Sequence, residues 1–181
     1  MGFQCGWCSA DTSCDVVEEC SNGDIATSTS QCPSPAITSI APLRGPVEGG
    51  TRLTITGTNL GAAFSDIVEV TLQGTSDVTC NVAEYESDYI PETQVVCETE
   101  AFSSVGDYVV VVEVNRSDGP VLSSGVSFSV EQPTVSGVSP EFGPVSGGVE
   151  VMISGSKLDT GNTEDTRVVL NGVECVMREC V

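Results

Sequence analysis

The stretch that decides the fold is IAPLRGPVEGGTRLTITGTNL, residues 40–60, which recurs without gaps 98 residues later. The second copy, residues 138–158, reads VSPEFGPVSGGVEVMISGSKL and keeps Pro, Gly-Pro-Val, Gly-Gly, Ile, Gly and Leu at the same offsets. This period is too long for a solenoid unit and is about the length of one small β-sandwich. The sequence therefore predicts tandem domains, the second of which is cut before its end.

The composition predicts small cores held together by cross-links. Hydrophobic residues make up 39% and aromatic residues 5% of the 181 positions, and nine of the positions are cysteines. Such a cysteine content in a short chain is typical of disulfides formed in an oxidising compartment. Five of the cysteines crowd into the first 32 residues: Cys5, Cys8, Cys14, Cys20 and Cys32.

The charge excludes several classes of partner. With 26 acidic against six basic side chains, the formal net charge is −20. This field repels polyanions, so we expect neither nucleic acid nor anionic lipid as a partner. No apolar run approaches the roughly 20 residues of a membrane-spanning helix, and Met1–Gln4 does not open a signal peptide. A disulfide-rich chain of this kind is therefore expected to be an excerpt from a longer protein.

Alternating apolar and polar residues predict an all-β domain over residues 36–131. Turn-forming Gly-Gly, Gly-Pro and Asp-Gly pairs separate the alternating runs. A cysteine-rich leader, residues 1–35, precedes this domain, and the truncated second copy occupies 132–181 with almost no linker. The predicted inward positions are Leu53, Ile55, Val68, Val70, Leu72, Tyr108, Val110, Val112, Val114, Val126, Phe128 and Val130.

The cysteine spacing predicts structural disulfides. Cys80 and Cys97 are the only cysteines of the complete domain, so we expect them to be bonded to each other. The motif Cys5-Gly6-Trp7-Cys8 also fits a zinc or redox pair, but zinc needs further ligands at short spacing and a redox pair needs a strand–helix context. A disulfide role is preferred there. The partner of Cys175 is either Cys180 or a cysteine beyond residue 181.

The residues for catalysis are missing, so we expect no enzyme and no cofactor. The chain contains no histidine, which removes Ser-His and Cys-His nucleophile pairs. The segment Gly45–Gly50 lacks the Lys-Ser/Thr of a phosphate loop and is interpreted as a turn. Alternation in a strand or loop would place Glu84, Glu86 and Asp88 on one face, where weak calcium binding is the alternative to a solvated surface. Asn115-Arg116-Ser117 is a candidate N-glycosylation site at Asn115.

The two Gly-Pro-x-x-Gly-Gly segments resemble the opening of IPT/TIG domains, which are immunoglobulin-like modules. The first copy, residues 42–61, is especially similar to the first such module of plexins. The leader, with Cys5-Gly6-Trp7-Cys8 followed by Cys14 and Cys20, is similar to the second half of a PSI module. The order PSI, IPT, IPT also matches plexins. This resemblance implies tandem IPT/TIG sandwiches and disulfide roles for the five leader cysteines.

Resemblance to plexins implies a single-pass cell-surface receptor whose semaphorin-binding propeller lies upstream and whose cytoplasmic region lies downstream. It also implies that a full receptor of this kind can pair as a homodimer. Residues 1–181 would form its extracellular stalk and would reach the membrane only through a segment outside them. The hepatocyte growth factor receptor family shares the module order and is the nearest alternative. Rel-type transcription factors and secreted polysaccharide-degrading enzymes also carry TIG modules, but the PSI-like leader argues against both.

Overall fold

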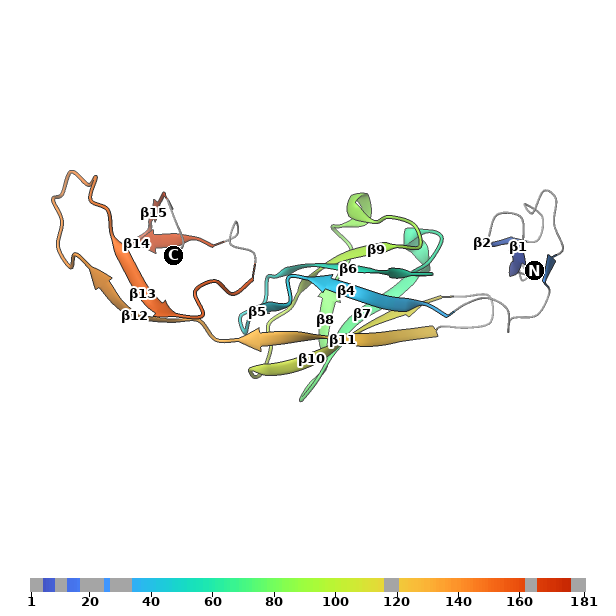
Figure 1. The fold of residues 1–181 in the computed structure, drawn as a ribbon. Helices are drawn as coiled ribbons and strands as arrows, with labels where there is room; N and C mark the ends of the chain where they lie inside the picture. Colours follow the sequence, from blue (N-terminus) through green and yellow to red (C-terminus); the bar gives the residue numbers. More distant parts are fainter. Residues whose placement is uncertain are drawn as a thin grey trace.

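The computed structural model describes residues 34–115, 121–161 and 166–176, together with the backbone of three short leader strands. Those strands are β1 (Cys5–Cys8), β2 (Ser13–Val16) and β3 (Ile25–Ala26), and they form an antiparallel sheet in the order β2-β1-β3. Figure 1 shows the leader strands beyond one end of a central sandwich and the second copy beyond the other. The all-β class expected from the sequence is confirmed.

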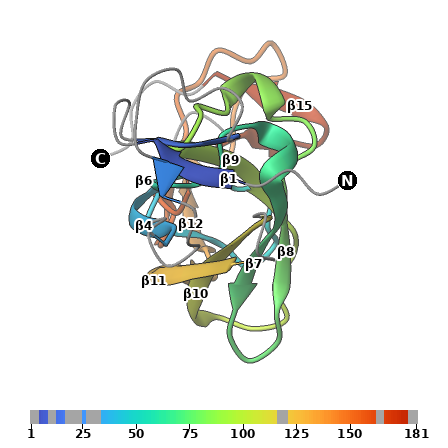
Figure 2. The same cartoon turned by 90° about the vertical axis from the view of Figure 1, so that its right-hand side faces the viewer.

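The central domain consists of eight strands that form two packed layers. One layer holds the order β4-β6-β9, the other holds β7-β10-β11-β5, and β8 joins them by pairing with both β7 and β9. The layers lie one above the other in Figure 2. The strands are β4 (Ala36–Ala41), β5 (Arg44–Pro46), β6 (Arg52–Thr58), β7 (Ile67–Gln73), β8 (Val78–Asn81), β9 (Gln94–Thr99), β10 (Gly106–Val114) and β11 (Val121–Glu131).

The core lies between these layers, as the alternation of apolar and polar residues predicted. Leu53 and Ile55 of β6 are 0% exposed, and Tyr108 of β10 is 1% exposed. The ring of Phe102 lies 4.9 Å from that of Tyr108 and 6.0 Å from that of Phe128 on β11. This sandwich therefore has its own core. Each fully buried large apolar side chain in it stabilises the fold by about 1.5–3 kcal/mol relative to an exposed one.

The inward orientation predicted for Val68 is wrong. Its side chain is 53% exposed, whereas Ile67, Val70 and Leu72 of the same strand are buried. The cause is an irregularity in the pairing of β7 with β10 next to Val114, which pairs with Ile67. Such a bulge inserts one residue and reverses the side-chain alternation beyond it.

Two further local expectations need correction. Glu86–Asp88 form a short 3-10 helix, η3, instead of a strand, so Glu84, Glu86 and Asp88 do not share a face by alternation. The Gly45–Gly50 segment is also not a turn throughout, because Arg44–Pro46 form β5, which pairs in parallel with the end of β11. The turn itself begins after Pro46, where the Gly49 amide donates to the Pro46 carbonyl at 3.1 Å.

The second copy reproduces the first hairpin of the central domain. Its strands β12 (Thr134–Ser139) and β13 (Met152–Ser156) pair as β4 and β6 do, with a register shift at the equivalent place. The hydroxyl of Thr38 donates to the Thr56 carbonyl at 3.0 Å, and Ser136 donates to Ser154 at 3.1 Å. Thr38 and Ser136 are equivalent residues 98 positions apart, as are Thr56 and Ser154, so the sequence repeat is also a structural one. A second pair, β14 (Val168–Leu170) and β15 (Val173–Cys175), follows.

Candidate functional site: the joint between the repeats

The two repeats meet at Glu131, the last residue of β11. Only Gln132 and Pro133 separate it from Thr134, the first residue of β12. The Glu131 side chain is only 16% exposed, although it stands at the end of a strand. Its backbone carbonyl accepts the amide of Val47 at 2.8 Å. The end of the first domain is therefore fixed by its own fold before the second copy begins.

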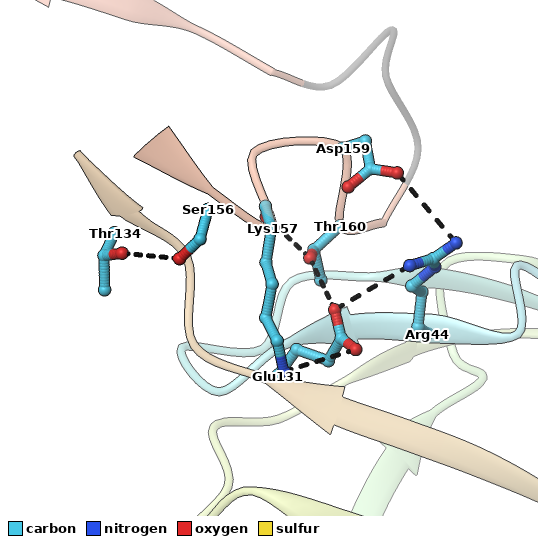
Figure 3. Close-up of polar contacts among 7 residues, drawn as sticks. All are labelled: Arg44, Glu131, Thr134, Ser156, Lys157, Asp159 and Thr160. Atoms are coloured by element: carbon cyan, nitrogen blue, oxygen red, sulfur yellow. Dashed lines mark hydrogen bonds and ion pairs between the residues drawn. The ribbon is translucent and has the colours of Figure 1, made fainter. Parts of the chain in front are cut away.

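Side chains from both repeats converge on the Glu131 carboxylate (Figure 3). From the second copy, Lys157 Nζ lies 3.4 Å from Oε1 and the Thr160 hydroxyl lies 3.1 Å from Oε2. From the first, an Arg44 guanidinium nitrogen lies 4.0 Å from Oε2. Arg44 also approaches Asp159 of the second copy at 3.9 Å. Glu131 and Arg44 therefore each face groups of both repeats.

The energetics of these contacts differ with their exposure. The Arg44 pairs are long and the Arg44 side chain is 50% exposed, so each is worth about 0.2–1 kcal/mol and weakens with added salt. Glu131 is better shielded, and its carboxylate accepts a hydrogen bond from the Thr160 hydroxyl and forms an ion pair with Lys157, whose side chain is half exposed. Hydrogen bonds to charged groups contribute about 1.5–3 kcal/mol. The Glu131 carboxylate is therefore the strongest point of the joint.

Backbone packing completes the joint. Gly161 has a φ of +86°, and a Cβ built on it would lie 3.5 Å from Cδ of Pro46 and 3.9 Å from Oγ1 of Thr51. The turn that follows β13 therefore lies against the β5–β6 corner of the first domain. Thr51 Oγ1 is buried there without a hydrogen-bond partner among the described residues.

The predicted bond between Cys80 and Cys97 is present and joins β8 to β9, with an S–S distance of 2.09 Å. Both cysteines are buried in the core. Cys175 is a half-buried free thiol, while Cys180 lies outside the described residues.

The structure describes only part of the other predicted cysteine sites. The backbones of Cys5, Cys8 and Cys14 lie on β1 and β2, but their side chains, like all of Cys20 and Cys32, are outside the described residues. The two leader strands pair with Trp7 opposite Cys14. The disulfide roles of these five cysteines stay a prediction.

The glycosylation candidate Asn115 is exposed and directly follows β10. Its backbone amide donates to the Asp66 carbonyl at 2.7 Å, which fixes the position at which the side chain leaves the domain. Arg116 and Ser117 lie outside the described residues, so use of this site also stays a prediction.

An acidic hollow of about 510 Å³ opens between β8, β9 and the β5–β6 corner. Its lining includes Glu48, Glu84, Glu98 and Glu100. Beside it, the Tyr85 hydroxyl donates to Glu98 at 2.7 Å, and this hydrogen bond, followed by desolvation, raises the pKa of Tyr85 to about 12. Arg52 pairs with Asp88 at 2.9 Å and lies 5.5 Å from the Tyr85 ring centroid. These contacts hold the 82–93 loop against β6 and β9.

No cluster of three or more potential metal-binding side chains occurs in the part of the chain that the structure describes. Within the same residues, no helix is long and apolar enough to cross a membrane. The joint connects two domains through a half-buried carboxylate.

A match to a protein-family model agrees with the fold and with the position of the joint. The IPT/TIG domain model matches residues 35–130 and 133–179, which together are well over half of the chain. The chain belongs to the IPT/TIG domain family. The break between the two matches falls at the joint, directly after Val130.

Among individual proteins, the chain is similar to plexins, as the sequence resemblance implied. It is 38% identical to Plexin-B2 of Mus musculus over 173 residues, which are 96% of this chain and 9% of that protein. Plexin-B1 of Homo sapiens is 38% identical over 178 residues, 96% of this chain and 8% of its own length. The chain thus spans less than a tenth of the length of these relatives.

A solved structure of the full extracellular region of Plexin A4 superimposes with a TM-score of 0.67 and 30% identity over 97% of this chain and 15% of that one. A second structure of this region gives a TM-score of 0.60 and 31% identity over 87% and 16%. Both matches extend over more than one domain of this chain.

The side-chain contacts at the joint were not predicted from the sequence. The near-absent linker was recognised, but the role of Glu131 was not. A signal was present, because the only lysine of the chain, Lys157, stands where the first copy has Asn59.

Proposed function

We propose that this chain is an extracellular stalk segment of a plexin-like cell-surface semaphorin receptor. In this proposal it sets the distance and orientation of other parts of the receptor and neither binds ligand nor catalyses a reaction. Semaphorin would engage a propeller upstream of these residues, and the attachment to the membrane and any homodimer contact would lie elsewhere in the receptor.

The observation that carries the proposal is the joint at Glu131. A two-residue linker containing Pro133 restricts the reach and the bending of the connection. The Glu131 carboxylate, held by Lys157 and Thr160, adds contacts across it. A short connection that contains proline and has side-chain contacts across it supports a spacer that transmits orientation.

The surface chemistry also supports a passive stalk. The net charge of −20 at neutral pH discourages adhesion between copies at a crowded cell surface. The chain contains no histidine, and the hollow at Glu98 gathers carboxylates without a nucleophile beside a base. Nucleophilic catalysis by a Ser, Thr or Cys side chain needs such a pair in contact.

The test is to insert a flexible Gly/Ser linker after Glu131 in the full receptor. We expect semaphorin affinity to be unchanged and signalling to fall, because the flexible segment uncouples the domains on either side. The matched control places the same insert after Ser76, in the exposed turn between β7 and β8, where it leaves the joint intact. Normal signalling by the Glu131 insertion would contradict the proposal.

A further inference from the structure

Asn59 and Lys157 occupy the same place in successive repeats. They lie 98 residues apart in the sequence. Asn59 directly follows β6, and Lys157 directly follows β13. Their φ angles are 57° and 56°. Positive φ is uncommon for residues other than glycine, and asparagine is among the residues that tolerate it best. Both repeats therefore build the same left-handed turn with different side chains.

The lysine in this turn calls for a physical reason. Lysine has no local hydrogen bond that favours the left-handed conformation, so the backbone alone would prefer asparagine, as in the first copy. A residue kept in an unfavourable conformation points to a contact that its side chain makes. For Lys157 that contact is Glu131, with Nζ 3.4 Å from Oε1.

Both turn residues reach to the segment by which the chain enters their own domain. Asn59 Nδ2 lies 3.4 Å from the carbonyl of Ser34, two residues before β4. Lys157 reaches Glu131, three residues before β12. In each repeat the turn thus contacts the chain just upstream of the first strand. In the second repeat that chain still belongs to the first domain, so the contact spans the joint.

We propose that the left-handed turn residue of each repeat is a positioning residue that ties its domain to the incoming chain, and that Lys157 in this role sets the orientation of the second repeat. This inference rests on the proposed spacer function and names the residue through which it works. The two ties differ in strength. Lys157 offers a charge to a shielded carboxylate, whereas Asn59 offers a neutral amide to an exposed carbonyl at long range.

The variant Lys157→Asn tests the role without harming the turn, because it installs the residue that the first repeat uses. Residual dipolar couplings of the full 181-residue chain report whether β4–β11 and β12–β13 share one alignment tensor. We expect a shared tensor in the wild type and a smaller, separate one for β12–β13 in Lys157→Asn. Glu131→Gln should give at least this loss, since it also removes the charge that faces Arg44. Adding Lys157→Asn to it should have little further effect, because the Lys157–Glu131 ion pair is already gone.

The control is Arg167→Gln, which removes one positive charge from the second copy but makes no contact with Glu131 among the described residues. It should keep the wild-type tensor. A shared tensor in Lys157→Asn would overturn the inference while leaving the spacer proposal standing. Separate tensors already in the wild type would overturn both.

Discussion

At the scale of single residues, burial and hydrogen bonding decide which side chains have a fixed role. Cys80 and Cys97 are enclosed by the core, and Glu131 is shielded although it is charged. Because Cys80 and Cys97 are the only cysteines of the central domain, the sequence alone was enough to predict their pairing. The single lysine, Lys157, stood out in the sequence, but nothing there showed which of the 26 acidic residues it contacts, because the contact joins two repeats.

The Cys80–Cys97 bond should stabilise the central domain. Replacing both cysteines by alanine removes a cross-link that spans 17 residues, which costs about 3 kcal/mol through the unfolded state, together with buried side-chain volume. Chemical denaturation of the variant measures the loss. Peptide mapping without reduction should recover the two cysteines linked, and alkylation of both thiols in secreted protein would contradict the pairing.

Tyr85 should ionise at unusually high pH. Its hydrogen bond to Glu98 raises its pKa to about 12, against about 10 in an unfolded chain. Because the folded pKa is the higher one, this contribution to stability is complete below pH ~10 and is lost as the pH rises through the folded pKa. Absorbance titration of the phenolate should lose its highest-pH component in Tyr85→Phe and shift it downward in Glu98→Gln. A native Tyr85 that titrates near its ordinary value would exclude the hydrogen bond.

Asn115 should carry an N-linked glycan in protein made by secreting cells. The side chain is exposed directly after β10, and the sequon continues with Arg116 and Ser117. Enzymatic deglycosylation should lower the mass of the wild type, and Asn115→Gln should abolish that change. A wild-type mass equal to that of the bare polypeptide would refute the assignment.

At the scale of elements, alternation predicts the long strands and fails where pairing is irregular. The predicted residues of β6, β10 and β11 face the core as expected, although the pairing of β10 with β11 also shifts register after Val110. Val68 faces solvent because of the bulge opposite β10, and Glu86–Asp88 form η3 because the loop folds back on β9. A bulge is a property of two paired strands, so one strand's sequence does not reveal it.

The repeat also makes a prediction about its glycines. A Cβ built on Gly57 would collide with the Ala36 carbonyl, and one on Gly155 with the Thr134 carbonyl. These contacts are with backbone, which cannot move aside, so Gly57→Ala should destabilise the central domain by about 1–3 kcal/mol. Gly137, whose Cβ would meet nothing within 4 Å, provides the control. Equal unfolding midpoints for Gly57→Ala and Gly137→Ala would contradict the close approach.

At the scale of the whole molecule, the order of modules was predictable and the way they are joined was not. The 98-residue offset located both IPT/TIG domains, whose matched ranges are 35–130 and 133–179. The contacts of Glu131 with Lys157 and Thr160 arise only when both repeats are folded. The central claim is that this molecule positions other parts of a receptor and does not itself recognise the ligand.

The most direct measurement of that claim is the binding of a semaphorin ectodomain to residues 1–181 immobilised on a surface, with no propeller present. A longer receptor segment that includes the propeller serves as the positive control on the same surface. The account predicts no saturable binding to residues 1–181 at concentrations that saturate the control. Saturable submicromolar binding to residues 1–181 alone would show that the stalk is a recognition surface and would contradict the account.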